Sequence, residues 1–375
     1  MKKEKENSKV LFISNTANFS KFNRPFMRWF REQNWRVDYA SPGEETVFDC
    51  DFHYSISIKR NPFSIKNVKA YRELKTILSS NSYNIIHCHT PMGSVLGRLA
   101  AKNIKEKTTL IYTAHGFHFY RGAPLINKLV YYPIEKYLAK YTDALITIND
   151  EDYKMAKLNF LSCQNIYKLN GIGVDLDRFM PCDNERRKIL RKNFGIGEMD
   201  FVILYVAEFI PRKNHKLFIR CIKTLNDRIK NLKVFFVGTG PLFHKHKKNI
   251  EAIGLSGIVQ FLGYRYDVEK LCNIADIGIS ASKQEGLPIG IVEYIVSGLP
   301  VVCSKIRGHV DVIINRQNGL LFNLNEPDQV IDSIVELYAD ENLRKMIIQS
   351  NLCVREKYSL NTAITKMAEI YKRCM

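Results

Sequence analysis

Short apolar runs alternate with longer amphipathic stretches along this chain. Short apolar runs are typical of buried strands, and apolar positions spaced three and four apart are typical of helices that cover a sheet. In the first half, helices are expected over 24–33, 67–78 and 94–101, and strands are expected over 10–13, 37–40, 85–88, 110–113, 144–148 and 166–169. This alternation predicts a mostly parallel sheet with helices on both faces.

The pattern is interrupted at Pro181–Lys192 by proline, Asp, Asn and a run of charges, and it then starts again. Strands are expected over 201–206, 234–237, 259–262, 277–280, 300–303 and 320–322, with helices over 216–228, 268–273, 289–297 and 330–338. The sequence therefore predicts an α/β protein with two doubly wound Rossmann-like domains that face each other across a cleft. Their expected ranges are 1–180 and 181–360, and 361–375 forms a closing helix that packs back on the N-terminal domain. The active site of such a protein is expected at the carboxyl ends of the strands.

The charge of the chain narrows the classes of partner. Lys and Arg number 56 and Asp and Glu 38, which gives a net charge of +18. This favours nucleic acid, an anionic membrane face or phosphorylated small molecules. Nine cysteines without a CxxC pair indicate free thiols in a reducing compartment and no zinc site. Since no apolar window approaches ~18 residues, we expect a cytoplasmic protein that can rest on the inner face of the cell membrane.

The segment Ser282–Glu293 is the most informative for chemistry. It follows an expected strand and opens a helix, with Pro288 in the first turn, Glu285 in the preceding loop and Glu293 about one turn inside. Backbone N–H groups that point out of the helix start belong to Gly286, Leu287 and Ile289. Such a helix start suits a phosphate, and ionised carboxylates beside it suit sugar hydroxyls. On spacing alone, a capped surface helix with an acidic residue near its start is the more common explanation.

Several short motifs, taken in order, resemble one family. Glu285 and Glu293 resemble the E-x7-E motif of the bacterial family 4 retaining GT-B glycosyltransferases. Other matching segments are Gly173-Val174-Asp175, Val237-Gly238-Thr239-Gly240-Pro241, Phe261-Leu262-Gly263, Gly298-Leu299-Pro300-Val301-Val302 and Asn318-Gly319-Leu320-Leu321. The stretch Ala114–Tyr120, with Pro133-Ile134-Glu135-Lys136, resembles members that build capsular and exopolysaccharide units. Each motif is weak alone, whereas the ordered set is specific and covers nearly the whole chain.

The resemblance implies roles for residues of the second domain. Glu285 would contact hydroxyls of the transferred sugar, Glu293 the ribose, and Lys213 the diphosphate of the nucleotide. The position of the family's motif Arg carries Glu208 here, so Arg212 either replaces the lost charge or is a solvated surface residue. The other donor-binding positions implied are Gly240, Gly286, Leu287 and Pro288. The glycines at 238 and 240 lack the third glycine of a dinucleotide fingerprint, so no NAD site is expected.

In the first domain, the resemblance implies that His115 lies near the reacting sugar, although a His at a strand end is more often structural. Asn15 and Thr16 belong to the acceptor-side loop, which lacks the Gly-Gly pair of many members, so a looser backbone approach is expected. His87 and His89 point to one face of a strand. No acid or Cys completes a metal site there, and a packing role is favoured.

Together these features predict a retaining glycosyltransferase that moves a sugar from a UDP-sugar to a polyprenyl-diphosphate-linked saccharide in surface polysaccharide assembly. Basic side chains and a helix terminus would hold the diphosphate, so no metal and no other cofactor is expected. The alternatives are a nucleotide-sugar isomerase of similar shape and a basic nucleic-acid-binding protein. The second is disfavoured because the positive residues are dispersed and no recognition motif is present.

Membrane contact is a separate hypothesis. The first helix combines Lys21, Arg24 and Arg28 with aromatic residues. Each Lys or Arg near an anionic surface contributes ~1 kcal/mol, so a few aligned cations give salt-reversible attachment. We therefore expect peripheral contact with an anionic membrane through the N-terminal domain.

Overall fold

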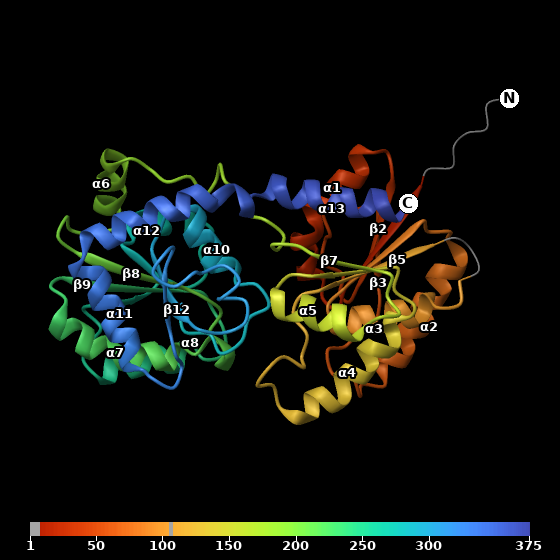
Figure 1. Ribbon diagram of the computed structural model, residues 1–375, viewed down its shortest axis with the longest axis horizontal. Coiled ribbons are helices and arrows are strands. Elements are labelled where there is room, and N and C mark those ends of the chain that lie inside the picture. The colour runs from red at the N-terminus through yellow and green to blue at the C-terminus, as the bar shows by residue number, and fades with distance from the viewer. Residues whose placement is uncertain (1–7, 105–107) are drawn as a thin grey trace. The chain divides into compact units, whose positions relative to one another are not determined.

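The computed structural model describes residues 8–104 and 108–375, so the charged segment 1–7 lies outside the described residues. The chain forms two compact units (Figure 1). The first comprises Met1–Ile172 together with Leu360–Met375, and the second comprises Gly173–Ser359. Within the described residues, no helix is both long and apolar enough to cross a membrane.

The first unit is built on a seven-stranded sheet of order β3-β2-β1-β4-β5-β6-β7. All its strand pairs are parallel. The strands are β1 (Lys9–Ile13), β2 (Arg36–Ser41), β3 (Phe52–Ser55), β4 (Ile85–His89), β5 (Thr109–Ala114), β6 (Ala144–Thr147) and β7 (Asn165–Lys168). The helices are the short η1 (Ala17–Phe19), α1 (Ser20–Glu32), α2 (Lys66–Ser80), α3 (Pro91–Ala101), α4 (Leu125–Ala139), α5 (Asp150–Asn159) and α13 (Leu360–Cys374).

Both faces of this sheet are buried. The apolar run in β1 is uninterrupted, which is typical of a strand that is covered on both faces. Successive side chains of a strand point to opposite faces. Leu11 and Ile13 therefore join the core beneath α2 and α3, while Val10 and Phe12 join the core beneath α1 and α13. These residues are fully buried. The sheet thus forms the middle of a three-layer α/β/α unit.

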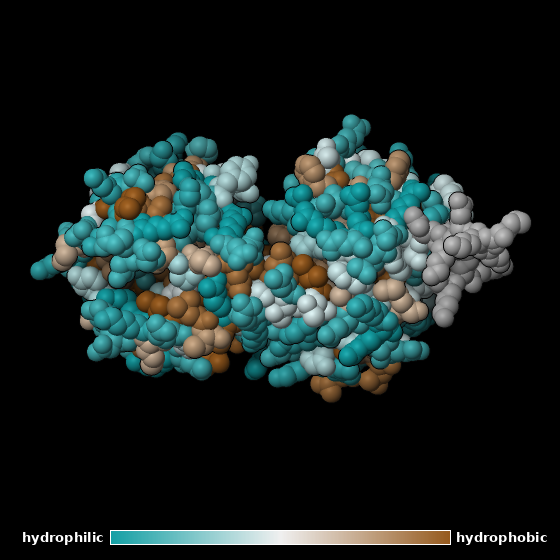
Figure 2. All heavy atoms as spheres, turned by 90° about the horizontal axis from the view of Figure 1, so that it is seen from above, coloured by the Kyte–Doolittle hydropathy of each residue, from teal (hydrophilic) through white to brown (hydrophobic). Residues whose placement is uncertain are grey.

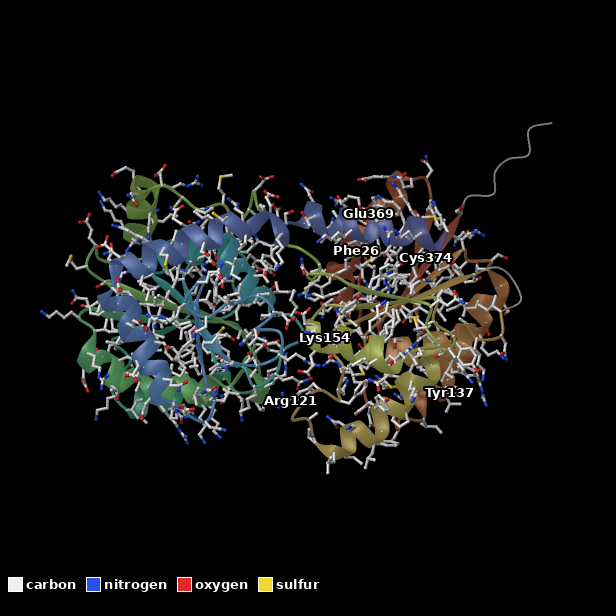
Figure 3. The ribbon with its side chains drawn as sticks, viewed as in Figure 1. Phe26, Arg121, Tyr137, Lys154, Glu369 and Cys374 are labelled. Carbon is white, nitrogen blue, oxygen red and sulfur yellow. The ribbon has the colours of Figure 1, made fainter. Side chains whose placement is uncertain are left out.

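Helix α13 belongs to the first unit although it ends the chain. Figure 1 shows it beside α1, and Figure 3 labels Phe26 of α1 and Cys374 of α13 on this pair. The Tyr371 ring stacks on Trp29 at a centroid distance of 5.6 Å and lies 4.5 Å from Phe30. Its hydroxyl pairs with His87 Nδ1 at 2.7 Å. The last helix therefore completes the core on this face of the sheet.

The second unit repeats the architecture with a six-stranded parallel sheet of order β10-β9-β8-β11-β12-β13. Its strands are β8 (Phe201–Val206), β9 (Leu232–Val237), β10 (Val259–Phe261), β11 (Ile277–Ser280), β12 (Val301–Ser304) and β13 (Leu320–Phe322). Its helices are α6 (Asn184–Asn193), η2 (Pro211–Lys213), α7 (His215–Arg228), α8 (Phe243–Ala252), α9 (Val268–Ile274), α10 (Ile289–Val296), α11 (Asp328–Ala339), α12 (Glu341–Val354) and η3 (Arg355–Tyr358). Two doubly wound parallel sheets confirm the predicted α/β class.

The division between the units falls after Ile172, eight residues before the boundary expected from composition. Val174 already pairs with the second unit, because its N–H donates to the Tyr358 carbonyl at 2.9 Å. Phe179 is buried in the core of that unit. The polar run from Pro181 onward therefore lies inside the second unit and leads into α6.

The strand order reverses once in each sheet, between β1 and β4 and between β8 and β11. At such a point, the loops that follow the two central strands separate, and ligands of doubly wound proteins bind there. The loops concerned follow Ile13 and His89 in the first unit, and Val206 and Ser280 in the second. The predicted site residues lie in or beside these loops.

Candidate active site

Tyr205 of β8 fixes the turn that carries the two predicted cations. Its hydroxyl accepts a hydrogen bond from the Ala281 N–H at 3.0 Å and donates to the Lys213 carbonyl. The Lys283 N–H donates to the Arg212 carbonyl at 2.8 Å. The loops after β8 and β11 are therefore held against each other, both through the shared Tyr205 hydroxyl and through a direct backbone hydrogen bond.

This arrangement brings Arg212, Lys213 and Glu285 together. Arg212 Nη1 lies 2.8 Å from one Glu285 carboxylate oxygen, and Lys213 Nζ lies 2.6 Å from the other. The carboxylate is buried, while the two cations are partly exposed. Burial alone would raise the pKa of Glu285, but Lys213 and Arg212 outweigh it and lower this pKa below its ordinary value. The cluster keeps one net positive charge, which is carried by partly exposed side chains.

Glu208, at the position of the family's motif Arg, is exposed and forms no ion pair within the described residues. Arg212 supplies the second cation from the next turn of chain. Whether Arg212 and Lys213 share a side could not be read from their adjacency. Hydrogen bonds to the two backbone carbonyls decide it, because the Lys213 carbonyl accepts from the Tyr205 hydroxyl and the Arg212 carbonyl accepts from the Lys283 N–H.

The loop after β11 ends at the start of α10. Pro288 precedes the first residue of this helix, one position earlier than the first-turn placement predicted from sequence. Gly286 and Leu287 connect Pro288 to Glu285, and their amides lie in the segment that enters the helix. A helix start of this kind presents unpaired N–H groups that suit a phosphate.

A third cation reaches this loop from the segment between β12 and β13, which sequence reasoning missed. Arg307 Nε donates to the Glu285 carbonyl at 3.2 Å. Next to it, Gly308 has a φ of 83°, and a Cβ there would lie 2.8 Å from the Gly286 carbonyl oxygen. The signal was available, because β12 neighbours β11 and its following loop must lie at the same edge of the sheet.

Glu293 lies on α10 and is half-buried. Its carboxylate accepts no hydrogen bond from the described part of the chain. Burial raises the pKa of Glu293 to about 7, with Arg178 opposing the rise and Glu269 adding to it. An unpaired carboxylate that costs free energy to bury is available to accept hydrogen bonds from ligand hydroxyls.

Gly240 contacts the protein itself. Gly238 and Gly240 have φ values of 135° and 148°, and the second would place a Cβ 2.8 Å from Phe209 N and O. The Phe209 N–H donates to the Thr239 carbonyl at 2.9 Å. The glycines therefore let the loop after β9 press against the loop after β8, and a donor contact at Gly240 stays a prediction.

In the first unit, His115 follows β5 and pairs with the last residue of β4. His115 Nε2 lies 3.1 Å from His89 Nδ1, and the Phe19 ring meets the His115 ring edge-on at 4.7 Å. Burial lowers the pKa of His115 to about 4, so this imidazole is neutral near pH 7. His87 fills a packing position, since its second nitrogen pairs with Thr113 Oγ1 at 2.8 Å.

The acceptor-side loop after β1 is fixed by backbone and side-chain hydrogen bonds. The Asn15 N–H donates to Thr90 Oγ1 at 2.9 Å, and Ser14 Oγ donates to the Thr16 carbonyl at 2.8 Å. These bonds fix the loop within the protein, and the expected looser approach of its backbone to the substrates stays a prediction. Gly93 of α3 allows close contact, because a Cβ there would lie 2.9 Å from Ser14 Cα. The glycine that permits tight packing between the loop after β1 and α3 therefore lies in α3.

A metal ion has no visible set of ligands here. Across residues 8–104 and 108–375, no group of three or more His, Cys, Asp or Glu side chains could hold one. Arg212, Lys213 and Arg307 are cations that the structure brings to the Glu285 loop.

The geometry defines a class of protein with two doubly wound nucleotide-binding-type units, one of which carries a cation-lined helix start. The family described as "Glycosyl transferases group 1" matches residues 186–351, and the "Glycosyl transferase 4-like" family matches residues 9–149. EpsD of Bacillus subtilis (strain 168), named as a glycosyltransferase, is 36% identical over 98% of this chain and 97% of its own length. The chain therefore belongs to the family 4 GT-B glycosyltransferases, and it is a glycosyltransferase.

More distant relatives carry more specific names. The Escherichia coli "UDP-Gal:alpha-D-GlcNAc-diphosphoundecaprenol alpha-1,3-galactosyltransferase" is 29% identical over 83% of this chain and 81% of its own length. Among solved structures, Anabaena HepE in complex with UDP and glucose superimposes with a TM-score of 0.78 at 17% identity, over 98% of this chain and 100% of that one. WaaG, a glycosyltransferase of lipopolysaccharide biosynthesis, gives a TM-score of 0.77 at 18% identity, over 96% and 99%. These structures confirm the GT-B fold.

Proposed function

We propose that this enzyme transfers a sugar, with retention of anomeric configuration, from a UDP-sugar to a polyprenyl-diphosphate-linked saccharide in exopolysaccharide assembly. The observation that carries the proposal is the cluster of Arg212, Lys213 and Arg307 around the Glu285 loop. Three cations and one buried carboxylate at a helix start suit a diphosphate joined to a hydroxyl-rich sugar.

In this proposal the cations and the α10 start stabilise the negative charge that develops on the diphosphate as the sugar leaves. Fixed charges aimed at developing charge lower the barrier without reorganisation during the reaction. Glu285 is oriented by Arg212 and Lys213 and accepts hydrogen bonds from the sugar hydroxyls. Glu293 holds the ribose. No metal ion is needed for charge neutralisation, and none is part of the proposal.

His115 is proposed as the group of the first unit nearest the reacting sugar, with Asn15 and Thr16 on the acceptor side. Its pairing with His89 Nδ1 leaves His115 Nδ1 as the nitrogen available to a substrate. Because its pKa is lowered to about 4, His115 acts as a neutral hydrogen-bond donor or acceptor.

The substrate classes rest on the relatives. The E. coli relative is named for UDP-Gal and a diphosphoundecaprenol acceptor. A Campylobacter jejuni relative, 24% identical over 84% of this chain and 82% of its own length, is named for a diphospho-undecaprenol acceptor. We place the reaction at the cytoplasmic face of the membrane. All nine cysteines are free thiols, which is typical of a reducing compartment.

The test is a transfer assay with UDP-, GDP- and ADP-sugars on a polyprenyl-diphosphate saccharide, with and without a metal chelator. We expect transfer from a UDP-sugar that persists with chelator, and proton NMR of the first product should show the donor's anomeric configuration. Lys213→Ala should reduce the stabilisation of the folded enzyme by UDP, while Lys283→Ala, on the same edge, is the matched control. A product of inverted anomeric configuration would contradict retention. A reaction that the chelator stops would contradict the absence of a metal, and transfer from a GDP-sugar alone would contradict the UDP-sugar donor.

A further inference from the structure

The first unit contains an apolar groove that the proposed reaction has not used. A cavity of about 610 Å³ lies between α2, α3 and α4. The side chains that line it include Val68, Val95, Leu96, Leu99, Phe117 and Ile134. Pro91 and Gly116, two residues beyond the ends of β4 and β5, also line it. The groove therefore starts beside the loop that carries His115.

The floor of the groove is electrically neutral. Arg98 and Glu135 are buried and lie 2.6 Å apart, and the Arg98 guanidinium also covers the Tyr112 ring at 4.2 Å. Arg98 Nη2 donates to Ser94 Oγ at 2.9 Å. Because each charge is paired and hydrogen-bonded inside the protein, the interior offers no charge to an anionic headgroup. It suits a hydrocarbon.

The rim has a different character. Large apolar side chains stand out from it, with Phe63 88% and Ile65 83% exposed. Segments 59–69 and 121–134 carry no acidic residue of their own, and their cations are Lys59, Arg60, Lys66, Lys69, Arg121 and Lys128. Acidic side chains of other segments offset part of this charge, since Glu73 lies 3.7 Å from Lys69 and the Glu151 carboxylate accepts a hydrogen bond from the Arg121 N–H. Arg121, in the loop before α4, and Tyr137, on that helix, are labelled in Figure 3. Hydrophobic patches also interrupt the hydrophilic surface in the space-filling view (Figure 2).

A neutral apolar groove whose rim carries more cations than anions is complementary to a long hydrocarbon that ends in phosphate. We propose that this groove binds the isoprenoid chain of the acceptor lipid, with the rim cations near its diphosphate. This inference rests on the proposed function for the identity of the lipid. It assigns the binding of the chain to α2, α3 and α4, and not to the basic face of α1.

The face of α1 fits this role less well. Arg24 and Arg28 both contact Asp49, the second at 3.3 Å. Arg31 lies 3.4 Å from Asp51. Acidic partners therefore offset much of the positive charge that the sequence showed on this helix.

Binding is tested with farnesyl phosphate as the probe and inorganic phosphate as its control, by calorimetry and by the shift in unfolding temperature. A ligand of the folded state raises that temperature. We expect saturable binding of farnesyl phosphate only. Val95→Trp and Leu99→Trp fill the groove from half-buried positions and should weaken binding at least tenfold. Leu158→Trp, on exposed α5, is the matched control and should bind like wild type.

The second arm uses two acceptors with the same saccharide diphosphate, one on a polyprenyl chain and one on a short alkyl chain. Both filling variants should raise the KM for the polyprenyl acceptor at least tenfold and leave the KM for the alkyl acceptor and for the donor unchanged. If wild type transfers to neither acceptor, the proposed function fails, and farnesyl phosphate binding still tests the groove separately.

Three results would overturn the inference. One is equal affinity for farnesyl phosphate and inorganic phosphate. Another is unchanged farnesyl phosphate binding in both folded filling variants. The third is a dimer that Ile134→Glu dissociates, which would assign the groove to a second copy of the chain. A protein that attaches to vesicles without isoprenoid through Phe63, and that has no affinity for farnesyl phosphate, would use the groove to contact the bilayer. That result would also overturn the inference.

Discussion

Replacing Glu285 by Gln should separate nucleotide binding from turnover. Glu285 carries one negative charge against the two positive charges of Arg212 and Lys213, at 2.8 and 2.6 Å. The substitution keeps the shape of the side chain and raises the net charge of this cluster from +1 to +2. A diphosphate nearby should therefore bind more tightly, whereas the sugar loses an ionised acceptor that is held in a fixed orientation.

The magnitude follows from Coulomb's law. At an effective dielectric constant of ~20, one unit charge ~5 Å from a phosphate is worth ~3 kcal/mol. Arg212 is 40% exposed, so solvent screening reduces this figure. We expect UDP affinity to rise by ~1 kcal/mol, or roughly fivefold. Turnover should fall at least ~100-fold if the carboxylate acts in the transition state.

Stability should fall moderately. Without the carboxylate, two partly exposed cations lose their partner and repel each other. We expect a loss of ~1–2 kcal/mol, less than the ~3–5 kcal/mol seen when one member of a fully buried pair is removed. Isothermal titration with UDP, single-turnover kinetics and thermal unfolding measure the three effects, and circular dichroism confirms folding. Weaker UDP binding with near-wild-type turnover would refute the reasoning.

Three further predictions concern the second unit. Lys213→Ala should weaken UDP binding about tenfold. It should also lower the unfolding temperature more than Arg212→Ala does, because Lys213 is 21% exposed and Arg212 is 40% exposed. Equal decreases in the unfolding temperature of the two variants, measured by calorimetry, would contradict this. Gly238→Ala should cost ~2–4 kcal/mol in chemical denaturation, since its Cβ would lie 2.1 Å from the Ala207 carbonyl oxygen, and an unchanged midpoint would contradict the clash. The folded-state pKa of Glu293, about 7, exceeds the unfolded value of ~4.3, so its contribution to stability is lost as the pH rises through this window. Compared with wild type, Glu293→Gln should therefore stabilise the protein more at pH 8 than at pH 5.5. It should also weaken nucleotide-sugar binding. A difference in unfolding temperature between variant and wild type that does not change with pH would contradict the stability argument.

Strands were predictable where both faces are buried. The run Phe201–Val206 is continuously apolar because β8 lies in the middle of a parallel sheet. The edge strand Phe52–Ser55 was missed, since it pairs only with β2 and stays half-exposed, so it has no such run. Helix α4 was missed as well. Pro133 lies inside it, and its apolar side chains at Leu125 and Leu129 are exposed, which removes the usual periodicity.

For the site, motifs were enough to single out Glu285 and Lys213, but not to orient Arg212. That orientation depends on the Tyr205 hydroxyl, which binds backbone groups from two different loops. Arg307 reaches the site from a third loop, after β12. Contacts of this kind depend on which strands are neighbours, which a local pattern does not specify. The ordered family motifs pointed to the candidate site, and tertiary packing determined which charges lie together there.

The position of α13 has a consequence for biosynthesis. The first unit lacks one of its core helices until residues 360–374 have been made, although its sheet is complete by Lys168. The 187 residues of Gly173–Ser359 must be translated in between, which takes ~10–40 s at ~5–20 residues per second. During that time the surface of α1 with Trp29 and Phe30 lacks its cover. The nascent chain therefore exposes an aromatic face, which chaperones that bind apolar surface would be suited to shield.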